Sequence, residues 1–368
     1  MSRGGLVASN EMAARPRILC VMQLPPPLHG VTAINAQIAA SPVIAEQFEL
    51  EVLPLQFSKT IAELGRISLG KLLRAGGVLA KLAWVLARRR PAAVYLTIAP
   101  QLPALYRDVA LLALVRVAGV PRIVHFQARP TPEVLPLLRH ALRGATVILL
   151  SPVLRSDLGD AIEDARVTYV ANGIADLACI ERSPHPVPRV LFVSNLLVEK
   201  GPLVLVEALS LLEARGIAFE VTFAGAPSRA ITETVMRQAL APFGPRARYL
   251  GRVVPEEVPA LYRDHDVFVY PTTSDAMPLT ILEAMRAGLP IVASDVGTIG
   301  ELLADTGVVV EPNQPLQLAM AIARLLAEPG SRAELGRSAR ARFVANYTQT
   351  RFDTALADAF MRGIAGCR

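Results

Sequence analysis

The stretch Pro271–Pro290 reads PTTSDAMPLTILEAMRAGLP, and it predicts a loop and a helix between two short apolar strands. Val267–Tyr270 before it and Ile291–Ser294 after it are runs of β-forming residues. Leu279–Ala287 has apolar residues at helical spacing, with a proline before its start and a glycine after its end, as is typical of helix termini. Strand, helix and strand in this order predict parallel strands of an α/β sheet.

Two carboxylates flank the start of this helix. Asp275 lies on the loop, and Glu283 follows eight positions later, about one turn into the helix. Free backbone N–H groups and the positive end of the helix dipole favour a phosphate between them. We therefore expect the backbone near Met277, Pro278 and Leu279 to meet a phosphate, and the carboxylates to accept hydroxyls. A sugar nucleotide has this layout of sugar hydroxyls, diphosphate and ribose hydroxyls.

The same stretch resembles the acid–seven–acid signature of the retaining glycosyltransferases of family 4, Glu-Gly-Phe-Gly/Pro-x-x-x-x-Glu-Ala-Met-Ala-x-Gly-x-Pro. Here Asp275–Pro278 stands in place of the first four positions, and Glu283–Pro290 matches the remainder. Ala293–Glu301 is similar to the next segment of that family. The resemblance implies the GT-B fold, in which two Rossmann-like α/β domains face a central cleft and the last helix crosses back to the first domain.

Strands alternate with helices twice along the 368 residues, which is too long for one ordinary core. A proline-rich run, Glu181–Pro188, separates the two halves and is typical of a linker. We expect an N-terminal domain at 1–182, a C-terminal domain at 183–345 and a crossing helix at 346–368. The resemblance implies that the first domain faces the acceptor and that the second binds the nucleotide sugar. Ligands of such sheets bind at the carboxyl ends of the strands.

A second loop of the C-terminal half is predicted to meet the diphosphate. Lys200 precedes a glycine at a helix start, at the carboxyl end of a strand. The family pattern is Gly-Arg-x-x-x-x-Lys-Gly, whose two cations neutralise the leaving diphosphate. Here Ser194 and Asn195 replace Gly-Arg, so Asn195 can donate a hydrogen bond but carries no charge. The alternative is a solvated lysine at a helix start.

Two candidate sites lie in the N-terminal half. Gly30 begins a helix after a prolyl loop, where the family has a glycine-rich turn, so it either lets backbone approach a phosphate or sugar, or simply starts the helix. The strand beginning at Ile123 carries His125 and Gln127 on one face. The resemblance implies that one of them faces the donor sugar. A packed, buried histidine is the alternative for His125.

The sequence indicates no metal site and no cofactor beyond the nucleotide sugar itself. Asp264–Asp266 reads Asp-His-Asp, like the metal-binding motif of another glycosyltransferase fold, but it precedes the strand Val267–Tyr270 and so lies at the amino edge of the sheet. We expect a polar turn there. The three cysteines, Cys20, Cys179 and Cys367, are too far apart for metal ligation and are typical of reduced thiols.

The net charge of +6 favours anionic partners, and no nucleic-acid motif is present. The apolar run from Ile67 to Arg90 is interrupted by Lys71, Arg74 and Lys81, which disfavours a membrane-spanning helix. The helix at Gly70–Arg90 either covers a sheet or rests on an anionic membrane surface. Further cations could extend this basic face: Arg129, Arg139, His140 and Arg143.

The resemblance implies a retaining, metal-independent hexosyltransferase, and together with the charge pattern it leads us to expect a cytoplasmic protein that could lie on the inner face of the cell membrane. Glu283 would hold the ribose, Asp275 the donor sugar, and Lys200 with Asn195 the departing diphosphate. The acceptor would be a sugar or a lipid-linked precursor of a surface polysaccharide. A sugar-nucleotide-binding protein without turnover and a sugar-nucleotide epimerase are the alternatives. The sugar, base and linkage stay open.

Overall fold

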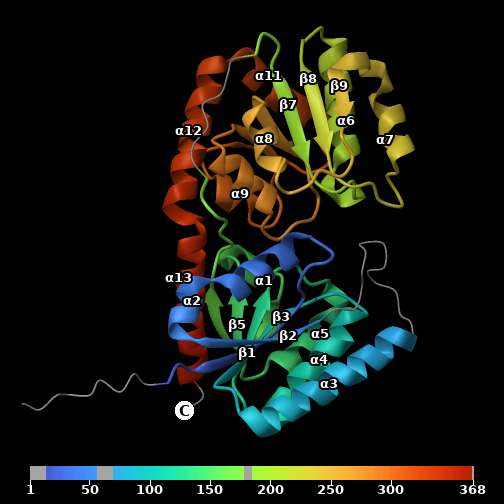
Figure 1. Cartoon of the computed structure of the whole chain (residues 1–368). Coiled ribbons are helices and arrows are strands. Elements are labelled where there is room, and N and C mark those ends of the chain that lie inside the picture. Colours follow the sequence, from blue (N-terminus) through green and yellow to red (C-terminus); the bar gives the residue numbers. More distant parts are fainter. Residues whose placement is uncertain (1–13, 56–68, 178–184, 367–368) are drawn as a thin grey trace, which may run out of the picture.

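The computed structural model describes residues 14–55, 69–177 and 185–366, which form two α/β lobes, one above the other (Figure 1). Each lobe is built around a sheet of six strands, and every recorded strand pair is parallel. The N-terminal sheet has the order β2-β1-β3-β4-β5-β6 and the C-terminal sheet β12-β11-β10-β7-β8-β9. The predicted fold class, two α/β domains with parallel sheets, is therefore confirmed.

The strands are short, as parallel strands buried on both faces usually are. Those of the N-terminal sheet are β1 (Arg17–Met22), β2 (Glu49–Pro54), β3 (Ala93–Ile98), β4 (Arg122–Phe126), β5 (Thr146–Leu149) and β6 (Arg166–Tyr169). Those of the C-terminal sheet are β7 (Arg189–Val193), β8 (Glu220–Ala224), β9 (Ala247–Tyr249), β10 (Val267–Tyr270), β11 (Ile291–Ser294) and β12 (Val308–Val310). All residues of β3, β4, β5, β10 and β11 are buried, because helices cover both faces of each sheet.

The helices fall into the same two groups. In the N-terminal domain they are α1 (Gly30–Ala40), α2 (Pro42–Gln47), α3 (Leu69–Arg89), α4 (Ala104–Val117) and α5 (Leu135–Leu142). In the C-terminal half they are α6 (Pro202–Ala214), α7 (Glu233–Leu240), α8 (Val258–Arg263), α9 (Leu279–Arg286), α10 (Ile299–Leu303), α11 (Pro315–Ala327), α12 (Pro329–Asn346) and α13 (Gln349–Ala365). Short 3-10 turns join several of these elements.

The last helix, α13, belongs to the C-terminal end of the chain but packs on the N-terminal sheet (Figure 1). Its Phe360 ring lies 5.1 Å from the Tyr95 ring of β3 and 5.6 Å from the Phe48 ring, measured between centroids. These contacts belong to a buried cluster on one face of the N-terminal sheet. The two domains are thus held together by a helix as well as by the connecting chain.

The two segments that cross between the domains pair with each other. Ile174 forms a parallel bridge with Thr348, in which Ile174 N–H donates to Tyr347 and Gln349 N–H donates to Ile174. Gly173 is required beside it, because a Cβ there would lie 2.4 Å from the carbonyl oxygen of Thr348. The predicted domain boundary near 182 lies outside the described residues, as does most of the proposed linker, and it stays a prediction.

Candidate active site

A cavity of about 1120 Å³ lies between the two domains, and its size suits a ligand as large as a sugar nucleotide. The N-terminal domain contributes Pro25–Leu28, the loop between β1 and α1. The C-terminal domain contributes the loops that follow β7, β8 and β9, where ligands of parallel sheets usually bind. The polar and charged lining includes Ser194, Asn195, Glu199, Ser228, Arg229 and Arg252.

Asn195 lines this cavity, and its hydrogen bond to a diphosphate stays a prediction. Two arginines that we did not predict line the cavity as well. Arg229 follows β8 and Arg252 follows β9, and both side chains are exposed. Within the part of the chain that the structure describes, neither guanidinium has a recorded ion pair or hydrogen bond. Positive charge therefore borders the cavity although Asn195 itself is neutral.

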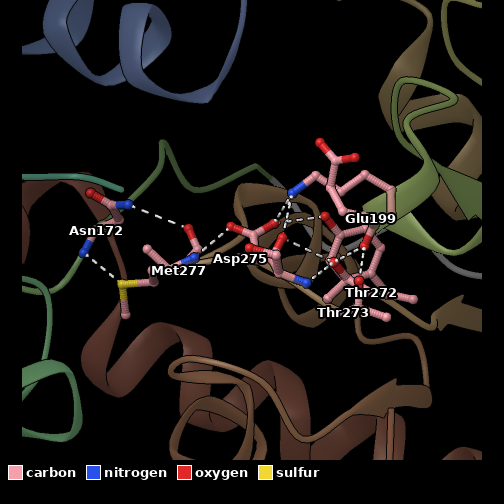
Figure 2. Close-up of polar contacts among 10 residues, drawn as sticks. Asn172, Glu199, Thr272, Thr273, Asp275 and Met277 are labelled. Atoms are coloured by element: carbon pink, nitrogen blue, oxygen red, sulfur yellow. Dashed lines mark hydrogen bonds and ion pairs between the residues drawn. The ribbon is translucent and has the colours of Figure 1, made fainter. Parts of the chain in front are cut away.

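The Lys200 loop lies directly against the loop that begins at Pro271. Gly201 has a left-handed backbone with φ of 72°, and a Cβ there would come within 2.0 Å of the Pro271 carbonyl oxygen. Thr273 N–H and the Thr272 hydroxyl both donate to the Glu199 carbonyl, at 2.7 and 2.8 Å (Figure 2). The glycine after Lys200 is thus needed to bring the two predicted loops together.

Lys200 and Asp275 form an ion pair with 2.7 Å between Nζ and Oδ2. Both side chains are mostly buried, at 19% and 18% exposure, so water screens the pair less than at an open surface. The Tyr270 hydroxyl donates to the same Asp275 oxygen at 2.7 Å, and Ala276 N–H donates to Asp275 Oδ1 at 2.9 Å. The structure brings the predicted cation and the predicted acid together, each neutralising the other. Their contacts with diphosphate and sugar stay predictions.

Glu283 lies on α9 as predicted, where it is half-buried. The Tyr262 hydroxyl donates to Glu283 Oε2 at 2.9 Å. Burial raises the pKa of the Glu283 carboxyl, and the hydrogen bond from Tyr262 and the nearby Arg286 partly offset that rise. Glu283 lines a small cavity of about 30 Å³ with Leu177, Tyr262 and Arg286, and it is absent from the lining of the large one. Its predicted contact with a ribose stays a prediction.

The start of α9 faces the N-terminal domain. Pro278 is the N-cap residue, and Met277 is buried, its sulfur accepting the Asn172 N–H at 3.1 Å (Figure 2). A Cβ on Gly30 would lie 4.0 Å from the Leu279 side chain, which is ordinary contact. Gly30 is the first residue of α1, which agrees with the helix-starting alternative, and the approach of a phosphate or sugar to its backbone stays a prediction.

His125 is fully buried within β4, where its Nδ1 lies 2.7 Å from the Tyr95 hydroxyl. Burial lowers the pKa of its imidazole to about 3, so the ring is neutral at physiological pH. This is the arrangement of the packed-histidine alternative. Its Nε2 and both side-chain amide atoms of Gln127 are buried without a hydrogen-bond partner among the described residues. A catalytic role for either side chain stays a prediction.

The Asp264–Asp266 segment is a polar turn at the amino end of β10, as expected. Asp266 Oδ2 accepts the Arg189 N–H at 2.8 Å and lies 3.1 Å from His185 Nδ1. His265 Nδ1 lies 2.6 Å from the Leu261 carbonyl oxygen. These contacts tie the turn to neighbouring elements. In the described ranges, no group of three or more His, Cys, Asp or Glu side chains is arranged to hold a metal ion.

Each of the three arginines of the predicted basic face lies against a carboxylate, so its charge is compensated locally, and the extension of the face stays a prediction. Arg129 pairs with Asp157 at 2.7 Å, and Arg139 pairs with Glu163 at 3.2 Å. Arg143 pairs in the same way with an aspartate at 3.2 Å. Helix α3 packs on the N-terminal core through a buried stripe near its C-terminal end. None of the described helices is long and apolar enough to cross a bilayer.

The polar partners of the two signature acids were missed in the sequence. Tyr262 and Tyr270 read as core residues of a helix and a strand, and only their contacts reveal them. Asn172 was missed although Asn-Gly is a recognisable turn dipeptide. Of the cysteines, Cys20 is buried, which raises its thiol pKa to about 12, and the other two lie outside the described residues.

Residues 187–328 match the model of a family described as glycosyl transferases group 1. The chain is 32% identical over 186 residues to a D-inositol 3-phosphate glycosyltransferase of Salinispora tropica, covering 48% of this chain and 38% of that protein. It is 46% identical over 66 residues to O-antigen chain mannosyltransferase B of Escherichia coli, covering 18% and 17%. These matches confirm the recognised family for the C-terminal half, and they span less than half of the curated relatives' length.

Solved structures match over nearly the whole chain. A glycosyltransferase from Rickettsia africae has a TM-score of 0.73 at 18% identity, covering 96% of this chain and 99% of that one. Anabaena HepE in complex with UDP-glucose has a TM-score of 0.73 at 18% identity, covering 94% and 100%. At such low identity the likeness concerns the fold alone, and it confirms the predicted GT-B architecture.

Proposed function

We propose that this protein is a retaining glycosyltransferase that moves a sugar from a nucleotide diphosphate sugar to a hydroxyl acceptor. The observation that supports this most is the Lys200–Asp275 pair, formed by two neighbouring loops at the carboxyl ends of β7 and β10. The first of these loops borders the interdomain cavity, and both lie within the matched 187–328 region. HepE, a structural neighbour, binds UDP-glucose.

In this proposal the donor diphosphate replaces Asp275 as the ion-pair partner of Lys200. Lys200 Nζ then meets the phosphate charge that grows as the bond to the sugar breaks, which lowers the barrier more than it strengthens ground-state binding. Asp275 is released to accept donor-sugar hydroxyls and to stabilise positive charge at the anomeric carbon. Arg229 and Arg252, which also line the cavity, supply positive charge that the neutral Asn195 does not.

Bond formation on the same face as bond breaking needs no protein nucleophile. The leaving phosphate oxygen takes the proton of the acceptor hydroxyl, so one bond to the anomeric carbon breaks as another forms there. No buried side chain has to serve as the base, which agrees with the low pKa of the enclosed His125. Glu283 would bind the ribose hydroxyls through its second carboxylate oxygen.

We propose further that the acceptor is a sugar or a lipid-linked precursor of a surface polysaccharide. Transfer to it would take place at the cytoplasmic face of a membrane. One relative is named for O-antigen chain mannosyl transfer. Helix α3 lies on the outside of the N-terminal domain and exposes Leu73 and Trp84 to 70% and 52% (Figure 1). Arg74, Lys81 and Arg88 are exposed on the same helix. Apolar side chains flanked by cations suit an anionic lipid surface.

The test begins with binding and ends with turnover. Thermal shifts with UDP-, GDP-, ADP- and dTDP-hexoses identify the donor, since a ligand that binds the folded protein stabilises it. Release of nucleoside diphosphate is then measured with and without n-octyl glucoside as acceptor, and the product's anomeric configuration is read by NMR. Acceptor-dependent release with retained configuration is expected. Binding without release favours the non-catalytic alternative, and conversion of the free donor to its epimer favours the epimerase.

A further inference from the structure

Each acid of the Asp275/Glu283 signature accepts a hydrogen bond from its own buried tyrosine. Tyr270, the last residue of β10, donates to Asp275 Oδ2 at 2.7 Å. Tyr262, on α8, donates to Glu283 Oε2 at 2.9 Å. The two tyrosines come from different elements, yet both reach toward α9 and its preceding loop. This doubled arrangement was not visible in the sequence.

Both hydroxyls donate to their acids, and the Tyr262 hydroxyl also lies 3.2 Å from the Thr280 carbonyl oxygen, a longer contact than the 2.9 Å to Glu283. Tyr270 and Tyr262 are 2% and 1% exposed. Burial, and then the nearby carboxylate, raises the pKa of each phenol well above its usual range, so both stay protonated. A protonated phenol beside a carboxylate forms a charge-assisted hydrogen bond, which is stronger and more directional than a neutral one.

The rings are held independently of the hydroxyls. Phe268 lies between them, with its centroid 5.4 Å from the Tyr262 ring and 6.2 Å from the Tyr270 ring. The Phe192 ring also lies near Tyr270, with 6.5 Å between the ring centroids. Replacing either tyrosine by phenylalanine therefore keeps the aromatic packing and removes one hydroxyl. That makes the contribution of each hydroxyl measurable on its own.

The acids have few other anchors. Asp275 has Lys200 and Ala276 N–H, and under the proposed function Lys200 leaves it for the diphosphate. Tyr270 is then the side chain that still orients Asp275. Among the described residues, the Tyr262 hydroxyl donates the one recorded hydrogen bond to the Glu283 carboxylate. The other carboxylate oxygen, Oε1, therefore stays available to accept a hydrogen bond from a ligand.

We propose that Tyr270 and Tyr262 are positioning residues, which hold Asp275 for the donor sugar and Glu283 for the ribose. Each hydroxyl occupies one carboxylate oxygen and turns the acid's remaining acceptor positions toward substrate hydroxyls. The ligand class is a pair of neighbouring sugar hydroxyls at each acid. This inference rests on the proposed function. It assigns an effect on turnover to the Tyr270 hydroxyl and an effect on nucleotide binding to the Tyr262 hydroxyl.

The test compares Tyr270→Phe with Tyr262→Phe, each serving as the other's control. Tyr270→Phe should lower kcat about tenfold or more and leave the affinity for free UDP or GDP within about twofold, because Asp275 acts on the sugar. Tyr262→Phe should weaken UDP or GDP binding in calorimetry about tenfold with a smaller effect on kcat. Melting temperatures of both variants identify any loss that comes from instability alone.

Double variants then show whether each hydroxyl acts through its acid. Tyr270→Phe should add nothing to Asp275→Asn, and Tyr262→Phe should add nothing to Glu283→Gln, because coupled residues are not additive. Equal kinetic effects of the two single variants, or full additivity with the acids, would overturn the inference while leaving transfer by the wild type intact. A wild type that neither binds nor turns over any of the four donors would overturn the proposed function instead.

Discussion

Lys200 is the residue whose replacement best separates binding from catalysis. It pairs with Asp275 at 2.7 Å and would exchange this partner for the leaving diphosphate. Lys200→Ala should lower kcat about 10²-fold, as loss of one preorganised donor does elsewhere, and should raise the donor KM much less. Steady-state kinetics with the identified donor measure both parameters. Lys200→Arg keeps the charge and is the matched control. A change confined to KM would mean that Lys200 only assists binding.

Glu283 gives a pH-dependent prediction for stability. Burial raises the pKa of its carboxyl above the unfolded value, so folding disfavours the charged form. As pH rises through the unfolded pKa, the unfolded chain loses this proton first, and the folded state becomes relatively less stable. Glu283→Gln keeps an acceptor for Tyr262 and removes the charge.

The Glu283→Gln variant should therefore gain stability relative to the wild type between acidic and neutral pH. Urea unfolding at pH 4 and pH 7 measures the difference. At pH 4 the two proteins should be closest, and at pH 7 the variant should be the more stable. If instead the wild type becomes increasingly more stable than the variant toward pH 7, the ionised Glu283 carboxylate is better solvated than its burial indicates.

Candidate site residues could be recognised in the sequence where one segment carries both the residue and its surroundings. Asp275 and Lys200 stand out because each lies in a strand–loop–helix pattern that can be recognised locally. Tyr262 could not be identified in this way, because its partner Glu283 lies on another helix. The burial of His125 depends on Tyr95 and α13, which come from distant parts of the chain.

Among the elements, those around the signature follow the sequence closely. The predicted strands Val267–Tyr270 and Ile291–Ser294 are β10 and β11, and the predicted helix from Leu279 is α9. Burial on both faces makes such strands continuous apolar runs, which are easy to recognise. The loops after β8 and β9 carry no such pattern, so their meeting at the cavity could not be predicted.

Those two loops supply the next prediction, since Arg229 and Arg252 border the cavity without a recorded partner in the described residues. Arg229→Ala and Arg252→Ala should each weaken nucleoside diphosphate binding about fivefold at low salt, a modest effect because both side chains are exposed. Calorimetry at two salt concentrations measures it. Asn195→Arg in the double variant should restore part of the affinity. Unchanged binding in the double variant would place the diphosphate elsewhere.

The turn at Asp264–Asp266 leads to a prediction about metals. It lies at the amino end of β10, and Asp266 is already bound by Arg189 N–H. We expect transfer to continue in EDTA without added divalent ions, because lysine, arginine and the start of α9 would neutralise the diphosphate. Activity assays with EDTA, and with EDTA plus excess Mg²⁺ or Mn²⁺, check this. Loss in EDTA with rescue by either ion would contradict it.

At the scale of the molecule, several contacts between the two domains could not be predicted from the sequence. The crossing segments pair at Ile174 and Thr348, and the Ser151 hydroxyl donates to Glu301 across the domains. Met277 accepts the Asn172 N–H beside the signature loop. These contacts join residues more than 100 positions apart, so no local pattern indicates them. They place the signature loop against the N-terminal domain, where the acceptor would bind.

If this molecule works at a membrane, as we propose, the outer face of α3 is where it would touch the lipid surface. Leu73, Lys81, Trp84 and Arg88 recur at helical spacing, so they share one face, and all four are exposed. Each cation near an anionic leaflet contributes about 1 kcal/mol, and this contribution falls with salt. The wild type should therefore float with anionic vesicles at low salt and less at high salt.

Two variants of equal charge change test this face. Lys81→Ala should reduce flotation, because its ammonium has no recorded ion pair in the described residues and Lys81 shares the exposed face of α3 with Trp84. Arg139→Ala removes one cation that already pairs with Glu163, so it should leave flotation unchanged. Trp84→Ser tests the apolar part and should reduce flotation at both salt concentrations. If the wild type stays unbound at low salt, or if the two charge variants behave alike, α3 is not the membrane surface. The acceptor is then best sought among soluble sugars, which need only the interdomain cavity.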